Sequence, residues 1–141
     1  NFNLAISLHS AIQKKREMVM PFSNKIDLNE LLDSLIYWYD KLRRIITFEY
    51  IIWENINDDL EDIKELVKIC KKVPSKVNII QYNSIGDKNY RSACKEKILN
   101  YQKYLDNNKI TNTIRYSKGN DINAACGQLA RKPSDFISYA K

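Results

Sequence analysis

Residues 45–52 read Ile-Ile-Thr-Phe-Glu-Tyr-Ile-Ile. Such β-branched and aromatic residues favour a strand, and a nearly continuous apolar run is typical of a strand buried on both faces of a parallel sheet. Glu49 is the one acid in this run. A buried carboxylate needs a polar interior or a nearby cation, so we expect a buried structural ion pair at Glu49 in preference to a catalytic base.

The segments on either side of this strand alternate between strand and helix patterns. The predicted elements are a strand at 2–8, a helix at 27–42, the strand at 45–52, a helix from 58 or 59 to 70, a strand at 76–82, a helix at 92–106 and a strand at 111–115. Asp27 is the predicted N-cap of the first helix. The alternation predicts right-handed βαβ units, and hence an α/β fold with about four parallel strands and about three helices. An open doubly wound sheet and part of a (β/α) barrel both fit.

Both architectures bind ligands at the carboxyl ends of their strands. Polar residues follow the predicted strands at this end: Ser7 and His9 after the first strand, Asn83 after the third and residues 117–121 after the fourth. We expect them to lie on one rim. His9 is the one histidine of the chain, and a structural role is commoner for such a residue than a catalytic one. Asn83 fits a turn equally well.

Basic and acidic residues are unevenly distributed along the chain. The 141 residues carry a net charge of +6, with a net −3 in residues 1–70 and a net +9 in residues 71–141. The basic second part suits a polyanionic partner such as a nucleic acid, although lysines on solvated helix faces explain it equally well at this level.

The three cysteines, Cys70, Cys94 and Cys126, lie outside any CxxC or Cys/His cluster, so the sequence predicts no zinc site. Cys70 lies on the apolar side of its predicted helix and is expected in the core. An odd number of cysteines without a signal peptide favours the reducing cytoplasm. No apolar run approaches the roughly 20 residues of a membrane span, and P-loop, GxGxxG, HExxH and GxSxG motifs are absent.

Several stretches of the chain match one family in the same order. They are residues 4–10, Arg16 with Met20-Pro21, residues 47–50, Asn57-Asp58, residues 77–80 with Tyr82-Asn83, Arg115, and residues 119–129. The last stretch, Gly-Asn-Asp-Ile-Asn-Ala-Ala-Cys-Gly-Gln-Leu, is highly specific. On these residues the chain resembles the RlmN/Cfr family of radical S-adenosylmethionine methyltransferases, which act on adenosines in RNA. Gln81 and Ser84 depart from the family pattern, which has proline at both places.

The resemblance implies a partial (β/α) barrel in which a [4Fe-4S] cluster reductively cleaves S-adenosylmethionine to a 5′-deoxyadenosyl radical. It implies that Cys126 receives a methyl group from one S-adenosylmethionine, and that this methyl group loses hydrogen to the radical made from a second. The carbon radical then adds to an adenine ring carbon, and a second cysteine releases the product while a transient disulfide bond forms. Ser7, Leu8, His9 and Asn83 correspond to S-adenosylmethionine contacts in the family.

The resemblance also implies an RNA partner, which gives the basic second part of the chain a function. Arg115, Lys118 and Arg131 are expected to contact phosphates. The expected reaction is methylation of carbon 2 of an adenosine in 23S rRNA, with tRNA as a candidate second substrate. Two alternatives stay open: a resistance-type enzyme that methylates carbon 8, and a non-catalytic basic α/β module that binds RNA.

The CxxxCxxC motif that binds the cluster in this family is absent from the chain, so no metal ligands are expected in it. We therefore expect the C-terminal half of a radical enzyme, with residues 1–115 as the second half of the barrel and residues 116–141 as a tail that carries the methyl-bearing cysteine. The expected partners are the missing N-terminal half and an electron donor for the cluster. This chain alone is expected to be inactive.

Overall fold

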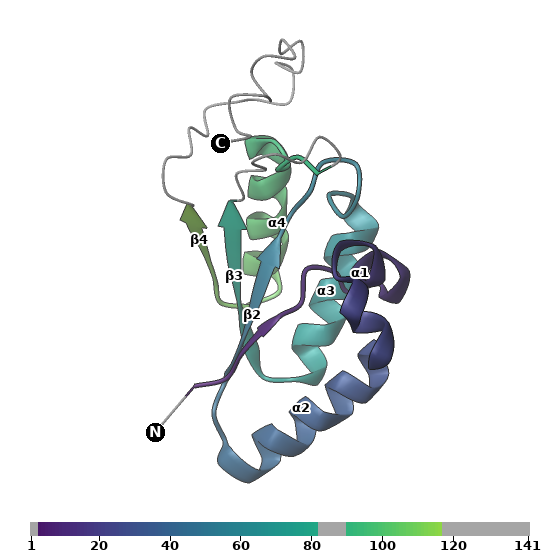
Figure 1. Cartoon of the computed structure of the whole chain (residues 1–141). Helices are drawn as coiled ribbons and strands as arrows, with labels where there is room; N and C mark the ends of the chain where they lie inside the picture. Colours follow the sequence, from purple (N-terminus) through teal and green to yellow (C-terminus); the bar gives the residue numbers. More distant parts are fainter. Residues whose placement is uncertain (1–2, 82–89, 117–141) are drawn as a thin grey trace.

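The computed structural model describes residues 3–81 and 90–116 of the chain (Figure 1). Its elements are β1 (Ala5–Ser7), α1 (Gln13–Val19), the 3₁₀ helix η1 (Pro21–Lys25), α2 (Leu28–Leu42), β2 (Ile46–Ile51), α3 (Leu60–Lys72), β3 (Ser75–Gln81), α4 (Lys95–Asn107) and β4 (Asn112–Tyr116). Every predicted strand and helix has its counterpart here, so the predicted order of elements is confirmed. No helix of the described chain is both long enough and apolar enough to cross a membrane.

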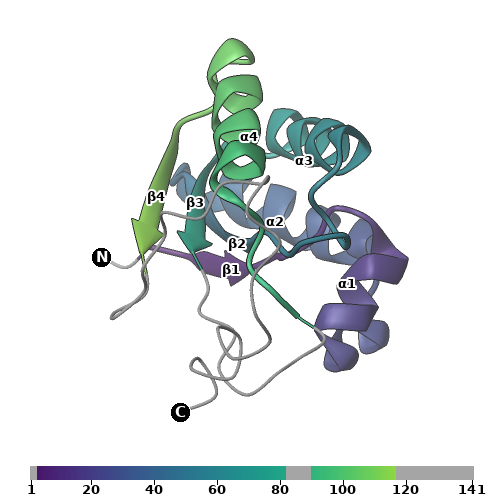
Figure 2. The same ribbon diagram turned by 90° about the horizontal axis from the view of Figure 1, so that it is seen from above.

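The strands β1 to β4 form one parallel sheet in which the spatial order follows the chain order. Parallel neighbours need crossover connections, which the helices provide. The helices lie on one side of the sheet, and no described helix covers the other face (Figure 1, Figure 2). Because a doubly wound sheet carries helices on both faces, this arrangement is that of part of a (β/α) barrel.

The helix α1 is a fourth α-helix in the described residues, so the prediction of three is wrong. It has 7 residues and no side chain that caps its first turn, since Ile12 stands at the N-cap position. Its buried residue is Arg16 and not an apolar side chain. Hydrophobic periodicity therefore could not identify this helix, which is held to β1 by polar contacts of Arg16.

Side chains along β2 alternate between buried and partly exposed. Ile46, Phe48 and Tyr50 are completely buried on the helix-covered face, whereas Thr47 and Glu49 on the other face are partly exposed. The prediction that this strand is buried on both faces is therefore wrong for the part of the chain that is described. An apolar strand sequence does not specify how many faces other elements cover.

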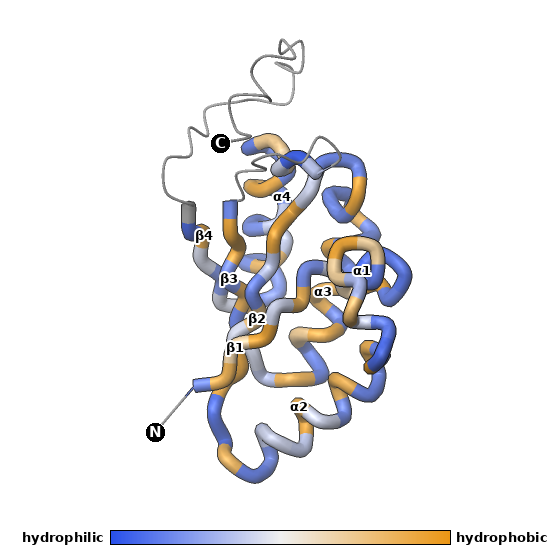
Figure 3. The backbone as a smooth tube through the Cα atoms, viewed as in Figure 1, coloured by the Kyte–Doolittle hydropathy of each residue, from blue (hydrophilic) through white to orange (hydrophobic). Residues whose placement is uncertain are grey.

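The hydrophobic core lies between the helices and the covered face of the sheet. Hydrophobic and hydrophilic residues alternate along α2 and α3, as expected for helices that bury one side (Figure 3). The buried apolar residues of α2, α3 and α4 are Leu28, Leu32, Leu35, Ile63, Leu66, Val67, Ile69, Cys70, Ile98, Tyr101 and Leu105. The predicted core position of Cys70 is thus confirmed. Two further leucines of these helices, Leu60 and Leu99, lie outside the core and are 53% and 46% exposed.

Aspartate side chains cap the N-termini of the helices α2 and α3. The Asp27 carboxylate accepts a hydrogen bond from the Glu30 backbone N–H at 2.8 Å, which confirms it as the N-cap of α2. Asp59 and Asp62 form a capping box at the start of α3. The buried Asp62 carboxylate also lies 2.9 Å from the Lys15 ammonium group, so this cap joins α1 to α3.

Replacing the cap in Asp27→Ala should lower the free energy of unfolding by about 1 kcal/mol, because the first turn of α2 loses an acceptor. Asp33→Ala is the matched control, since Asp33 is exposed in the middle of the same helix and should change stability by less than about 0.5 kcal/mol. Chemical denaturation followed by circular dichroism measures both. Equal losses in the two variants would contradict the capping role.

Candidate functional site

The carboxyl ends of β1 and β2 form the rim on which the sequence predicts a ligand site. Ser7 is exposed, His9 is partly exposed and the Leu8 side chain is completely buried. The Leu8 N–H donates to the Glu49 carbonyl oxygen at 2.9 Å, which continues the pairing of the two strands. A ligand at this rim can therefore meet the side chains of Ser7 and His9, but only the backbone of Leu8.

The buried side chain of Arg16 binds the backbone of residues 7 and 8. Arg16 of α1 donates from Nε to the Leu8 carbonyl oxygen at 3.1 Å and from Nη2 to the Ser7 carbonyl oxygen at 3.2 Å. Hydrogen bonds from a charged donor are stronger than neutral ones. Loss of water on burial lowers the pKa of Arg16 from its ordinary value. The carbonyl groups of the segment are thus satisfied within the protein.

His9 has a left-handed backbone conformation with a φ of 58°, which is uncommon for residues other than glycine. Its Nδ1 accepts a hydrogen bond from the Ile51 N–H at 3.0 Å, and its ring meets the Trp53 ring edge-on with centroids 5.6 Å apart. Burial, followed by the nearby charge of Arg16, lowers the pKa of His9 to about 4. Near neutral pH the imidazole is therefore uncharged and carries its proton on Nε2, where it acts as a donor.

The segment before α4 contacts the carboxyl ends of β2 and β3. The Ala93 N–H donates to the Ile52 carbonyl oxygen at 2.8 Å, and the buried Gln81 donates from Nε2 to the Ser92 hydroxyl at 2.8 Å. Gln81 stands where the family pattern has proline, and it makes this contact with a side-chain amide that proline lacks. The substitution therefore has a structural role in this chain.

One row of polar side chains crosses the uncovered face of the sheet. Ser7, Glu49, Asn78 and Thr113 are register partners on β1, β2, β3 and β4. Neighbouring residues of a strand point to opposite faces, so this row points away from the helices. The Thr113 hydroxyl donates to Asn78 Oδ1 at 3.1 Å. We call these four residues the polar row; they offer both hydrogen-bond donors and acceptors below the rim.

Glu49 forms an ion pair as predicted, but the pair is not buried. Its carboxylate lies 3.7 Å from the Arg115 guanidinium of β4, and the side chains of Glu49 and Arg115 are 30% and 62% exposed. Exposed pairs of this kind contribute at most about 1 kcal/mol. Arg115, predicted to contact RNA, therefore keeps most of its side chain accessible on the uncovered face.

Four predicted site residues, Asn83, Lys118, Cys126 and Arg131, lie outside the described residues. Within the part that is described, no group of three or more His, Cys, Asp or Glu side chains could hold a metal ion. No disulfide bond joins the two described cysteines, Cys70 and Cys94, and the transient disulfide that the resemblance implies would involve Cys126, outside the described residues. Cys70 is a free thiol whose pKa burial raises to about 11.

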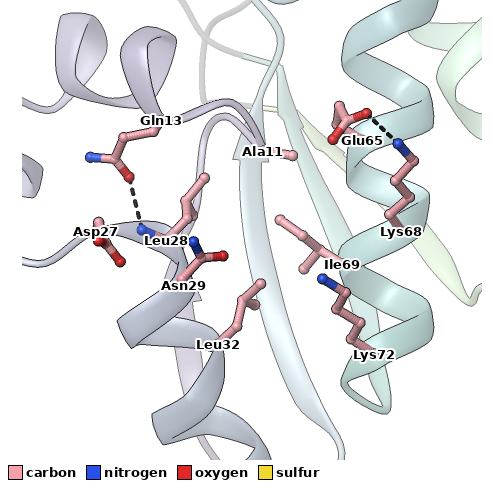
Figure 4. A pocket seen from close by; sticks show the side chains of 10 residues that line it. All are labelled: Ala11, Gln13, Asp27, Leu28, Asn29, Leu32, Glu65, Lys68, Ile69 and Lys72. Carbon is pink, nitrogen blue, oxygen red and sulfur yellow. Dashed lines mark hydrogen bonds and ion pairs between the residues drawn. The ribbon is translucent and has the colours of Figure 1, made fainter.

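A separate pocket of about 300 Å³ lies between α2 and α3 on the helical side of the sheet (Figure 4). Some of its polar groups already have partners: Gln13 Oε1 accepts from the Leu28 N–H at 2.8 Å, and the Lys68 ammonium lies 2.8 Å from the Glu65 carboxylate. The rim and the polar row therefore form the better candidate for a ligand site.

Curated relatives match almost the whole chain, although no protein-family model matches it. The probable dual-specificity RNA methyltransferase RlmN of Flavobacterium psychrophilum is 50% identical over 131 residues, which are 93% of this chain and 38% of the relative. The dual-specificity RNA methyltransferase RlmN of Lawsonia intracellularis is 45% identical over 126 residues, 89% of this chain and 35% of that one. The chain is thus similar to RlmN proteins over almost its whole length. It spans well under half the length of these RlmN relatives.

Solved structures support the same fold. A radical SAM methyltransferase from Sphaerobacter thermophilus has a TM-score of 0.80 and 30% identity over 91% of this chain and 38% of that one. A domain of pyruvate-formate lyase-activating enzyme from Bacteroides vulgatus has a TM-score of 0.63 and 16% identity over 79% of this chain and 66% of that one, and shares the fold alone. The predicted radical SAM α/β fold with four parallel strands is confirmed.

Two residues at the rim received no role from the sequence, although both lie in stretches that resemble RlmN. Arg16 supports the end of β1, and Asn57 donates to the His9 carbonyl oxygen at 2.7 Å. In the sequence, the position of Asn57 shortly after an apolar strand is only a weak indication that its side chain bridges several backbone groups. Apart from the resemblance, nothing distinguished Arg16, because two lysines precede it and suggest a solvated helix face.

The low pKa of His9 predicts that stability depends on pH. Between pH 6.5 and about 4 the unfolded chain binds a proton at His9 that the folded chain does not bind. The free energy of unfolding should therefore fall as the pH is lowered through this range, by at most about 3 kcal/mol from this residue.

The matched control is His9→Asn, because asparagine tolerates the left-handed conformation and offers an acceptor oxygen. Carboxylates titrate in both chains, so the difference between their slopes of stability against pH isolates His9. Urea denaturation at a series of pH values measures the slopes. Identical slopes would contradict an uncharged, hydrogen-bonded imidazole in the folded state.

Proposed function

We propose that the chain forms the S-adenosylmethionine-binding and methyl-carrying part of a cytoplasmic RlmN-type enzyme that methylates carbon 2 of an adenosine in 23S rRNA, with tRNA as a second substrate. The observation that carries the proposal is the rim at residues 7–9. There, Ser7 at the end of the polar row and the neighbouring His9 place two side-chain donors at the edge of the uncovered face of the sheet.

S-Adenosylmethionine has a carboxylate, an ammonium group, ribose hydroxyls and an adenine ring, so its site needs both donors and acceptors. The Ser7 hydroxyl and the Nε2–H of neutral His9 supply donors, and the Glu49 carboxylate supplies acceptors. An uncharged His9 also avoids repulsion of the sulfonium cation. Asn83 completes the proposed site from the segment that follows β3.

The cluster supplies the electron that starts radical chemistry in this family. The chain contains three widely spaced cysteines and no CxxxCxxC motif, so its residues do not fit a [4Fe-4S] cluster and no step through the cluster is assigned to them. The proposed contributions of this chain are the binding of S-adenosylmethionine and a thiol. The cluster-binding region and an electron donor are its proposed partners.

Cys126 is the proposed methyl carrier. It stands between Ala125 and Gly127, which have little side-chain bulk, and Lys118, Arg131 and Lys132 are near it in the sequence. Cations that lie close to a cysteine favour its thiolate form. Cys70 is a poor alternative because it is buried in the core and burial raises the pKa of its thiol to about 11.

RNA is proposed to bind along the basic second part of the chain. Arg115 exposes 62% of its side chain beside the polar row, and Lys118 and Arg131 follow it in sequence. Lys97 and Lys103 line a groove of about 460 Å³ between α3 and α4. Phosphate contacts from these cations would position the RNA, and the target adenosine would leave its stack to reach the rim.

Cys126→Ala should abolish adenosine methylation in a full-length chimera, in which this chain replaces the matching segment of the Flavobacterium psychrophilum relative. Mass spectrometry of the unsubstituted chimera should detect a methyl group on Cys126. Cys70→Ala is the matched control and should retain activity, because its thiol is buried in the core. Full activity of Cys126→Ala would overturn the role of Cys126.

The products of the same chimera separate the alternative functions. Nucleoside mass spectrometry distinguishes 2-methyladenosine from 8-methyladenosine. Detection of 8-methyladenosine would show that carbon 8, and not carbon 2, is methylated. RNA binding without any methylation would favour the non-catalytic module.

Arg115→Ala should weaken binding of single-stranded RNA and reduce the slope of log K against log salt concentration by about 0.7, as expected for one lost phosphate contact. Lys68→Ala is the control, because Lys68 is 68% exposed but lines the pocket between α2 and α3, which is not part of the proposed RNA surface. Fluorescence anisotropy with a labelled oligonucleotide measures both. Equal effects in the two variants would remove Arg115 from the proposed RNA surface.

A further inference from the structure

The Asn57 side chain is completely buried, and each of its polar atoms has a partner at the rim. Its Nδ2 donates to the carbonyl oxygens of His9 at 2.7 Å and Ile51 at 2.9 Å, and its Oδ1 accepts from the Trp53 N–H at 2.6 Å. One carboxamide therefore joins the end of β1 to two points at the end of β2.

The backbone of Asn57 extends the same network into the core. Its carbonyl oxygen accepts a hydrogen bond from the Tyr101 hydroxyl of α4, and that hydroxyl lies 3.1 Å from the Tyr50 hydroxyl of β2. Both tyrosines are completely buried. Buried polar groups are costly to leave without a partner. The contact with Tyr101 in the core therefore fixes the position of the Asn57 backbone. The Asn57 side chain in turn fixes the backbone of His9 and Ile51 at the rim.

The backbone conformation and the ring orientation of His9 depend on the position of the Asn57 side chain. Its left-handed backbone is a conformation that the surrounding structure must enforce. Its carbonyl oxygen is bound by Asn57, and its Nδ1 is bound by the N–H of Ile51, whose own carbonyl oxygen is the second acceptor of Asn57. The carboxamide thus holds together the two residues whose contact orients the imidazole.

We propose that Asn57 is a positioning residue for S-adenosylmethionine: through its two donated hydrogen bonds it holds His9 against Ile51, so that the Ser7 hydroxyl and the Nε2–H of His9 are presented to the ligand together. Asn57 itself is buried and acts only through His9. The ligand part of this inference rests on the proposed function, because it assumes that residues 7–9 bind S-adenosylmethionine.

The test compares two variants that break the same network on opposite sides. Asn57→Asp keeps the shape and the Oδ1 acceptor but loses at least one of the two donated bonds at the rim. Tyr101→Phe removes the hydroxyl that bonds to the Asn57 backbone and leaves the His9 contacts in place. Both should destabilise the fold, but only Asn57→Asp should disturb His9.

The first readout is nitrogen NMR of the imidazole, which is unambiguous because the 141-residue chain has one histidine. In the wild-type chain and in Tyr101→Phe, Nδ1 should give the shift of a hydrogen-bonded acceptor and Nε2 that of a protonated nitrogen. In Asn57→Asp the two shifts should approach the averaged values of a free imidazole. Unchanged shifts in folded Asn57→Asp would overturn the positioning role.

The second readout is the dissociation constant for S-adenosylmethionine, measured by calorimetry on the same chains. Asn57→Asp should raise it at least tenfold, and Tyr101→Phe less than twofold. Equal increases in both variants would mean that Asn57 has only a structural role. Absence of binding to the wild-type chain would instead count against the proposed function, while the NMR result would still decide whether Asn57 positions His9.

A measurement on the wild-type chain decides the case if Asn57→Asp does not fold. The side-chain amide protons of Asn57, donated to two carbonyl oxygens in a buried site, should exchange with solvent far more slowly than those of Asn100, which is exposed on α4. Similar exchange rates for the two side chains would overturn the proposal.

Discussion

Ile46, Phe48 and Tyr50 remove one face of β2 completely from water, and the arrangement of the chain depends on this burial. Strands that run parallel need long crossover connections, and right-handed crossovers between successive strands place their helices on the same side of the sheet. The helices therefore cover one face, no described helix covers the other, and the carboxyl ends of the strands meet at one rim (Figure 2).

The open face and the rim have a different chemistry from the core. A carboxylate at Glu49 would cost several kcal/mol if it were buried, but it is tolerated because no described helix covers that face of the strand. At the rim, Arg16 and Asn57 satisfy the backbone carbonyl groups from inside the protein. This support leaves Ser7 and an uncharged His9 at the rim where the ligand site is proposed.

Local patterns were sufficient for much of this fold. The four strands and the helices α2, α3 and α4 follow from apolar periodicity, and the cap Asp27 follows from short-range hydrogen bonding, which depends on residues within one turn. The structure decides that Asp59, and not Asp58, caps α3. The ordered motifs that end in residues 119–129 were sufficient for the family. The short helix α1 was missed because Arg16 anchors it and no apolar stripe marks it.

Tertiary structure alone decided which face of β2 is covered, how Glu49 is paired and why Asn57 matters. The sequence predicted a strand with two buried faces and a buried ion pair. In the described residues, however, helices cover only one face of the sheet, and the partner of Glu49 is the exposed Arg115 of β4. Asn57 and His9 are separated by 48 positions in the chain. Composition and periodicity describe neighbours along the chain, whereas burial and hydrogen-bond partners depend on segments that only folding brings together.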